Sequence, residues 1–468
     1  MIKRLALPVA LVLVAALVHP AAATQIAARG VPSPTVTPIA AGAGNGHAIS
    51  GSKGVVDLAA RGYQEDEYLI SGRANAYEQA SNWTDDGVWP TRTTSSDNPY
   101  TTRLMVVRPT NPAKFNGTVV LEWLNVSFGV DIPVDFSQSR EHFIREGYVY
   151  VGVTAQKLGT DKLKSLDPAR YNGVDIRHDM LSYDIFSQAA QAVRSDPRLL
   201  GGRSPSVVLA SGHSQSALRL TTYTNAIQPV DNVFNGVLIH GRAGLAAPIG
   251  DGLTGPLSAR IRTDLRVPVF TLQAETDIIA SNSVRQDTAL VRTWEVAGTA
   301  HADRYGLDLY NRANARDKGI NGGAETTCDK PVNDMTFRYA ENAAFAHLDR
   351  WARGGAAPPR AVPIFMLFGL VIVRDSDQNA LGGVRLPDLD APVAAYAPNN
   401  SGGNVAGACG LLGTTTPLSA QRILQLYPDH ATYVAKFTAA ADRALRGGYL
   451  VRADYDEAVA RANAAKVP

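Results

Sequence analysis

Cysteine is scarce in this chain, since only Cys328 and Cys409 carry a thiol among 468 residues. Neither has a companion at the spacing of a zinc site, so we expect no metal to be held by them. Two cysteines in an exported protein usually form one disulfide. We therefore predict a Cys328–Cys409 bond, with two free buried thiols as the alternative.

The chain also lacks an excess of either charge. It has 45 basic and 43 acidic residues, and removal of residues 1–23 would leave 43 of each, because Lys3 and Arg4 are the only charged residues there. No basic stripe or acidic tail is present, which argues against a nucleic-acid partner. The same balance argues against electrostatic binding to a membrane surface.

Long apolar runs are confined to the N-terminus. Leu5–Val18 follows two basic residues and precedes Ala21–Ala23, an arrangement typical of a signal peptide and too short for a convincing membrane span. An uncleaved anchor is the alternative. The apolar run at 364–373 is briefer still and predicts a buried strand or hairpin. We expect residues 1–23 to be removed and the mature chain to be secreted or periplasmic, without a stable membrane span.

The rest of the chain predicts one large α/β domain. Residues 24–55 are rich in Ala, Gly, Pro and Thr and suit a flexible lead-in. Residues 56–468 suit an α/β domain with insertions and a C-terminal helical extension. Its β-prone runs lie at 67–70, 103–107, 118–123, 148–153, 207–210, 236–239, 267–272 and 292–296. Its helical stretches lie at 137–146, 183–194, after 215, and at 337–353, 419–446 and 453–465. The first strands look antiparallel. The later alternation of strands and helices predicts a mostly parallel, doubly wound sheet with helices on both faces.

The strongest motif is Gly212-His213-Ser214-Gln215-Ser216, between a predicted strand and a predicted helix. This context is typical of a nucleophile elbow, in which a sharp turn exposes the serine above the sheet. Gly212 supplies one of the two small residues that the turn needs, and Ser216 stands where glycine is usual. Ser214 is therefore the predicted nucleophile, His213 is expected to shape the pocket, and a chance turn is the alternative.

An elbow predicts an acid and then a histidine later in the chain. Asp277 follows one predicted strand and His301 follows the next, at the sheet edge where sites in such folds form. His301 is predicted to take the Ser214 proton, and Asp277 to hold its imidazole in the required tautomer. Glu275 is the competing acid, and a plain surface-loop role is the alternative for His301.

Acyl transfer also needs donors for the developing oxyanion. The backbone N–H of Gln215 is the predicted first donor. Asn125 or Val126, after the strand at 118–123, is the predicted second, and a simple connecting turn is nearly as good an account of that loop. No zinc-protease motif, calcium loop or glycine-rich phosphate loop occurs, so we expect no metal and no nucleotide cofactor.

Several segments resemble a poorly characterised bacterial α/β-hydrolase-domain family over most of the mature chain. They are Val120–Val126, Tyr183–Ala189, Ser214–Ala217, Gly382–Pro387 and Cys409–Pro417. The resemblance implies an α/β-hydrolase fold and supports Ser214 as nucleophile. Members of that family often carry Glu where this chain has His213, so substrate preference is not carried over.

These features favour a secreted hydrolase of carboxylic esters, acting on a small-molecule or lipid-like ester through an acyl-enzyme. An amidase or peptidase would use the same triad. A secreted binding protein on a non-catalytic hydrolase scaffold is the third reading. Any cap over the site is expected from residues 137–180 or 300–335.

Overall fold

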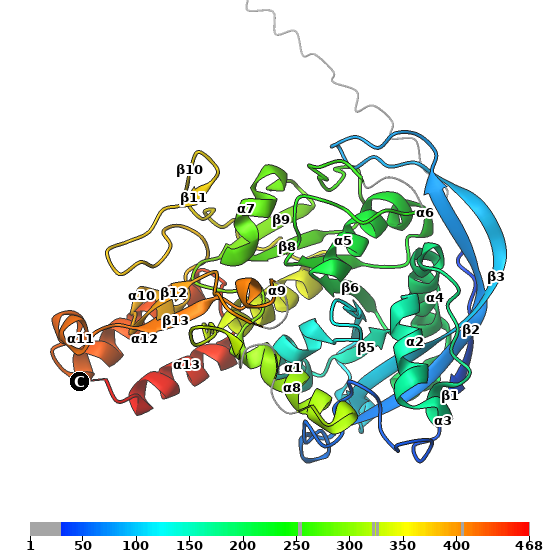
Figure 1. Ribbon diagram of the computed structural model, residues 1–468, viewed down its shortest axis with the longest axis horizontal. Helices are drawn as coiled ribbons and strands as arrows, with labels where there is room; N and C mark the ends of the chain where they lie inside the picture. The colour runs from blue at the N-terminus through cyan, green and yellow to red at the C-terminus, as the bar shows by residue number, and fades with distance from the viewer. Residues whose placement is uncertain (1–29, 251–254, 321–322, 324–326, 404–406, 468) are drawn as a thin grey trace, which may run out of the picture.

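The centre of the computed structural model is a nine-stranded sheet with the order β1-β2-β3-β5-β4-β6-β7-β8-β9 (Figure 1). The structure describes residues 30–250, 255–320, 323, 327–403 and 407–467, so the predicted signal peptide at 1–23 lies outside it. The pairs β1-β2, β2-β3 and β3-β5 are antiparallel, and the other five pairs are parallel. The prediction of a mostly parallel sheet is confirmed.

The antiparallel part contains β1 (Thr35–Pro38), β2 (Tyr63–Gln79) and β3 (Thr91–Pro109). β2 and β3 form long curved ribbons along one side of the molecule (Figure 1). β1 falls inside the segment expected to be a flexible lead-in, and that expectation is wrong for these four residues. They pair with β2 in register from Thr35–Ser71 to Pro38–Tyr68, because a partner strand downstream in the chain supplies hydrogen bonds that local composition does not reveal.

The parallel strands are β4 (Thr118–Trp123), β5 (Val149–Val153), β6 (Val207–His213), β7 (Gly236–His240), β8 (Val269–Ala274) and β9 (Val291–Val296). All their residues are buried except for one in β9. Strands with both faces covered read as continuous apolar runs, which is why these segments stood out in the sequence. Their carboxyl ends share one edge of the sheet, where the candidate site lies.

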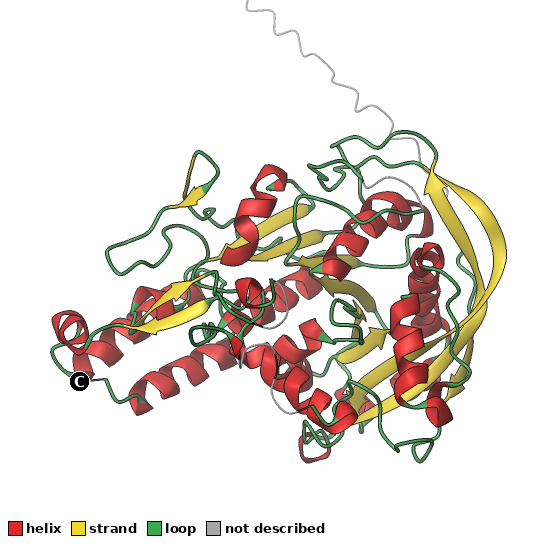
Figure 2. Ribbon diagram, viewed as in Figure 1, coloured by secondary structure: helices red, strands yellow, loops and turns green. Residues whose placement is uncertain are grey.

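Helices cover both faces of the sheet (Figure 2). The longer ones are α1 (Val134–Glu146), α2 (Lys157–Leu166), α4 (Ser182–Ser195), α5 (Gln215–Thr222), α8 (Arg304–Lys318) and α9 (Phe337–Ala352), and the short ones are α3 (Pro168–Tyr171), α6 (Gln228–Asp231), α7 (Ile278–Ser281) and α10 (Pro387–Asp390). Side chains alternate along β4: Val120 joins a core with α1 and α9, and Leu121 joins a core with α4 and α5. The doubly wound arrangement is therefore confirmed.

The C-terminal extension consists of α11 (Ala420–Leu426), α12 (His430–Arg446) and α13 (Arg452–Ala464). The helical stretch expected at 419–446 is two helices, because Pro428 follows the end of α11 and cannot donate a helical hydrogen bond. Asp429 then caps α12 by accepting from the Thr432 N–H at 2.7 Å. α12 and α13 lie next to a small sheet of β12 (Ala394–Ala397) and β13 (Thr414–Pro417) at one end of the molecule (Figure 1).

The apolar run at 364–373 forms a hairpin of β10 (Met366–Leu367) and β11 (Val371–Ile372). The hairpin agrees with the prediction, but the expected burial is wrong at its turn, where Phe368 is 97% exposed. The hairpin projects from the body of the molecule (Figure 1). Met366 and Ile372 pack against the core, whereas the side chains at and beside the turn are exposed. Within the described ranges, no helix is both long and apolar enough to cross a membrane.

The contribution of Asp454, on α13, to folding stability depends on pH. Its side chain is buried, accepts from Asn342 Nδ2 at 2.8 Å and lies 3.5 Å from Arg145. Burial raises its pKa from 3.8 to about 6. The folded state therefore holds this proton more tightly than the unfolded chain. The resulting stability is complete below about pH 4 and is lost as pH rises through 6, by at most about 3 kcal/mol.

We expect Asp454→Asn to flatten this part of the stability profile and to make the protein more stable than wild type at pH 7. Denaturant unfolding at several pH values between 4 and 7 measures the free energy of unfolding of each variant. Asp456→Asn is the matched control, because that side chain lies on the same helix and is 63% exposed. Parallel profiles for wild type and Asp454→Asn would contradict the assignment.

Candidate active site

Ser214 occupies the sharp turn between β6 and α5. Its backbone has φ 60° and ψ −118°, a conformation that costs an L residue about 1–3 kcal/mol and tends to persist at functional sites. Its N–H donates to the His240 carbonyl at 3.0 Å, which ties the turn to the end of β7. A Cβ on Gly212 would lie 3.2 Å from the Ser216 carbonyl oxygen, so a larger residue at 212 would crowd the turn.

Asp277 and His301 meet across the ends of β8 and β9. The His301 Nδ1 lies 2.6 Å from Asp277 Oδ1, and both side chains are less than 10% exposed. The other carboxylate oxygen of Asp277 accepts from the Ala274 N–H at 2.9 Å. The Thr276 hydroxyl accepts from the His301 N–H at 3.1 Å. This contact engages Nδ1, so Nε2 is the ring nitrogen left for a reacting group.

Glu275, the competing acid, is engaged elsewhere. It forms an ion pair with Arg374 and accepts from the Gly298 N–H at 2.6 Å. Burial raises its pKa, and the Arg374 guanidinium opposes that shift. The structure thus brings Asp277, and not Glu275, to the histidine.

His213 supports the His301 loop from below, a role that the sequence pattern did not predict. Its Nε2 donates to the His301 carbonyl at 3.0 Å, and the two ring centroids are 4.4 Å apart. Burial lowers its pKa well below the usual range, and the nearby His301 and His240 rings add to this shift. His213 is therefore a neutral positioning residue. Its place directly before the nucleophile was the available clue.

Asn125 and Val126, the two candidates for the second oxyanion donor, differ in whether their backbone N–H already donates a hydrogen bond. The Asn125 N–H donates to the Ile132 carbonyl at 3.2 Å, and its Nδ2 donates to the His213 carbonyl at 3.0 Å. Asn125 thus holds the turn before Ser214. The Val126 N–H has no hydrogen-bond partner within the described ranges, which favours Val126. Gln215 begins α5, where the first N–H groups of a helix have no partner inside it.

Ser214 and His301 line one cavity of about 390 Å³. The Ser214 hydroxyl makes no hydrogen bond to any described residue, and in unliganded sites such contacts are often long. Apolar side chains dominate the lining: Phe128, Ile132, Val134, Leu307, Tyr310, Ile320, Leu411 and Leu412. Part of this wall comes from α8, inside the 300–335 segment from which a cap was expected.

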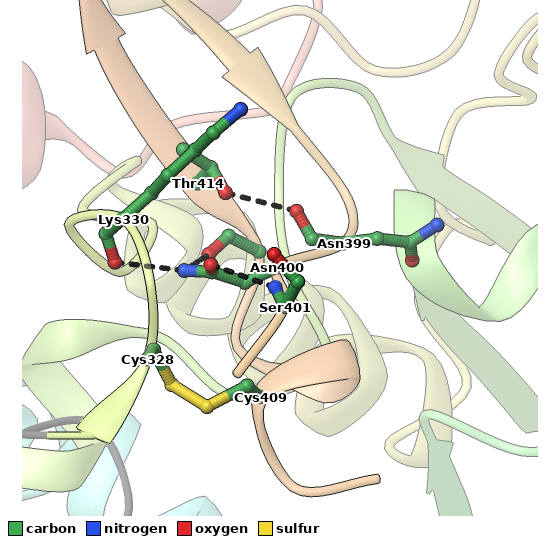
Figure 3. The surroundings of a disulfide bond; sticks show 8 residues. Cys328, Lys330, Asn399, Asn400, Ser401, Cys409 and Thr414 are labelled. Atoms are coloured by element: carbon green, nitrogen blue, oxygen red, sulfur yellow. Dashed lines mark hydrogen bonds between the residues drawn. A yellow bond between two sulfur atoms is a disulfide. The ribbon is translucent and has the colours of Figure 1, made fainter. Parts of the chain in front are cut away.

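Another part of the wall, at residues 408–412, is held by a disulfide. Cys328 and Cys409 are bonded to each other (Figure 3), as the sequence predicts. Next to the bond, Asn400 Nδ2 donates to the Lys330 carbonyl at 2.9 Å and the Thr414 hydroxyl donates to the Asn399 carbonyl at 2.9 Å (Figure 3). The loop that carries Ala408, Leu411 and Leu412 into the cavity is therefore fixed covalently and by hydrogen bonds.

Replacing both cysteines by serine is expected to lower the free energy of unfolding by up to about 4 kcal/mol, because the bond closes a long loop in the unfolded chain. Denaturant unfolding without reductant measures this effect. Wild type treated with reductant should behave like the double variant; unchanged stability in both would contradict the prediction.

Comparisons with known proteins agree with this architecture. A family model described as an alpha/beta hydrolase domain matches residues 35–460, and no curated protein matches the chain. Among solved structures, an α/β serine hydrolase without lid from Xanthomonas campestris is 14% identical, with TM-score 0.29, over 52% of this chain and 94% of its own. A fungal esterase from Rhizomucor miehei is 14% identical, with TM-score 0.29, over 61% and 85%. Esterase 2 of Thermogutta terrifontis is 14% identical, with TM-score 0.26, over 42% and 78%.

These structural likenesses are weak, and the assignment rests on the family match and the sheet. That match spans the elbow, both strand ends and most of the C-terminal extension. The chain belongs to the alpha/beta hydrolase domain family.

Proposed function

We propose that this protein is a secreted serine hydrolase that cleaves carboxylic esters through an acyl-enzyme intermediate. The observation that carries the proposal is the convergence on one cavity of a strained serine and a histidine that is already paired with an aspartate. Membership of the hydrolase family supports it. Ser214 is the nucleophile, His301 the base and Asp277 the orienting acid.

In the first half of the reaction, the Ser214 Oγ attacks the ester carbonyl carbon while its proton passes to His301 Nε2. The tetrahedral intermediate collapses, the bond to the alcohol oxygen breaks, and His301 returns the proton to the leaving alkoxide. In the second half, His301 takes a proton from water, whose oxygen attacks the acyl carbon. The acid leaves and Ser214 regains its proton. Asp277 stabilises the imidazolium in both halves.

The oxyanion of each tetrahedral intermediate needs donors already aimed at it. We assign the Gln215 N–H, at the start of α5, and the Val126 N–H, after β4. The side chain of Asn125 holds the elbow by its bond to the His213 carbonyl. Asn125 therefore acts through the position of the turn.

The cavity lining supports a substrate whose acyl or alcohol part is apolar. Large apolar side chains such as Phe128, Leu307 and Tyr310 line the cavity together with polar ones. Burial of an apolar chain against the apolar part contributes about 25 cal/mol per Å². A small-molecule or lipid-like ester meets this requirement.

Turnover of matched p-nitrophenyl esters and p-nitroanilides, with acyl chains of increasing length, tests the proposal. We expect ester hydrolysis that rises with chain length until the cavity is filled, and anilide hydrolysis that is much slower. Comparable anilide turnover would make the protein an amidase or peptidase. A folded protein that turns over neither class would be a binding protein on a hydrolase scaffold.

Export is a separate part of the proposal. Residues 1–23 carry the pattern of a signal peptide. N-terminal sequencing of protein recovered from the medium or periplasm should begin at Thr24. Recovery from the cytoplasm with Met1 retained would contradict export and leave the proposed chemistry untouched.

A further inference from the structure

Three ionisable side chains meet in the core behind the elbow. Asp135 on α1, His240 at the end of β7 and Glu341 on α9 are at most 1% exposed, and one potential ligand atom of each lies within 4.8 Å of the other two. The His240 Nδ1 is 2.8 Å from Asp135 Oδ1 and 3.8 Å from Glu341 Oε2. None of the three belongs to the proposed triad.

Several polar atoms of this cluster have no hydrogen-bond partner among the described residues. Asp135 Oδ2, His240 Nε2 and Glu341 Oε2 are all buried without a partner. The Ser139 hydroxyl contacts only the other oxygen of Glu341, at 3.1 Å. A buried polar atom without a partner costs about 1–3 kcal/mol. One group beside His240 Nδ1 could satisfy both carboxylate oxygens, whereas His240 Nε2 lies on the far side of the ring and is not part of this site.

Two more acidic side chains lie close to the cluster. Glu122 and Asp303 are also buried carboxyls. Glu122 itself is saturated, since it accepts from the N–H groups of Asp135 and Phe136 and from the Tyr150 hydroxyl. In the part of the chain that the structure describes, His240 is the only basic side chain within salt-bridge distance of Asp135 or Glu341.

We propose that Asp135, His240 and Glu341 bind a divalent transition-metal cation. One imidazole and two carboxylates are a ligand set for Zn²⁺ or Mn²⁺, and two negative charges are neutralised without a proton. Ligand atoms bonded at about 2.0–2.2 Å to one ion are about 3.0–3.5 Å apart. The His240 Nδ1–Asp135 Oδ1 pair at 2.8 Å would therefore open slightly, and the His240 Nδ1–Glu341 Oε2 pair at 3.8 Å would close slightly. The ion is structural, because all three ligands are buried.

The position of the site gives the ion a mechanical role. The His240 carbonyl accepts the Ser214 N–H at 3.0 Å, and the His240 ring lies 4.4 Å from the His213 ring. A cation bound by side chains of α1, β7 and α9 would fix the end of β7, to which the turn at Ser214 is hydrogen-bonded. The site departs from the expectation of no metal because its ligands are more than 100 residues apart in the chain, and short motifs detect only ligands that are close in sequence.

Elemental analysis of protein produced with added Zn²⁺ and Mn²⁺ tests the proposal. We expect about one bound ion per chain in wild type and in Ser214→Ala, and almost none in Asp135→Asn or Glu341→Gln. Asp303→Asn is the matched control, since it removes a neighbouring buried carboxyl that is not a ligand, and it should keep the ion. The Ser214→Ala variant is expected to be inactive and still to bind the metal. Metal binding is therefore tested independently of the proposed hydrolase activity.

A second measurement needs no variant. Removing the ion from wild type with a chelator should lower Tm, and added Zn²⁺ should restore it, because the metal binds only the folded chain. Wild type that holds no metal, with the same Tm in chelator and in Zn²⁺, would overturn the proposal. The cluster would then be completed by protons and a buried water.

Discussion

Ser214→Ala is expected to lower kcat for ester hydrolysis by roughly 10⁶-fold while the protein stays folded. The reason is that the proposed covalent intermediate forms on this hydroxyl, and the remaining groups only bind and polarise the ester. Removing the Oγ leaves the φ of 60° at this position in place, so the turn and its oxyanion donors persist. KM should change little.

Stopped assays with a p-nitrophenyl ester, together with far-ultraviolet circular dichroism, measure both parts of this prediction. Ser211→Ala is a suitable control, because that buried serine lies on the same strand and outside the cavity. It should retain activity within an order of magnitude. Turnover by Ser214→Ala close to that of wild type would mean that another group is the nucleophile.

Asp277→Asn is expected to cost about 10⁴-fold in kcat. The carboxylate lies 2.6 Å from His301 Nδ1 and keeps the proton on that nitrogen, so that Nε2 can accept from Ser214. An amide in its place can offer an N–H and favour the wrong tautomer. It also gives no charge to stabilise the imidazolium.

Glu275→Gln is the matched comparison, two residues earlier in the chain. It removes the ion pair with Arg374 but retains an acceptor for the Gly298 N–H. We expect lower thermal stability with kcat within tenfold of wild type. The reverse pattern, with Glu275→Gln inactive and Asp277→Asn near wild type, would assign the orienting role to Glu275.

The fold was predictable from local signals. The continuous apolar runs at β4, β5 and β6 reflect burial on both faces, and helical periodicity in α4 and α9 marked the covering layers. The triad candidates followed in the same way. Each candidate stands directly after a strand. Because parallel strands place their carboxyl ends at one edge of the sheet, residues that are distant in the sequence come close together there.

The rest depends on contacts between distant segments. β1 needs β2, and the exposure of Phe368 reflects the absence of a covering layer among the described residues. The support of His301 by His213 arises from a bond between a side chain and a carbonyl 88 residues away. Neither composition nor periodicity carries such information.

The most direct test of the proposed mechanism is labelling with a fluorophosphonate, followed by proteolysis and mass spectrometry. The reagent phosphonylates a serine only where a neighbouring base activates it. We expect one adduct per chain, on the peptide that contains Ser214, with none in Ser214→Ala and strongly slowed labelling in Asp277→Asn. A folded wild type that takes up no label, or takes it up on a different residue, would contradict Ser214 as the nucleophile.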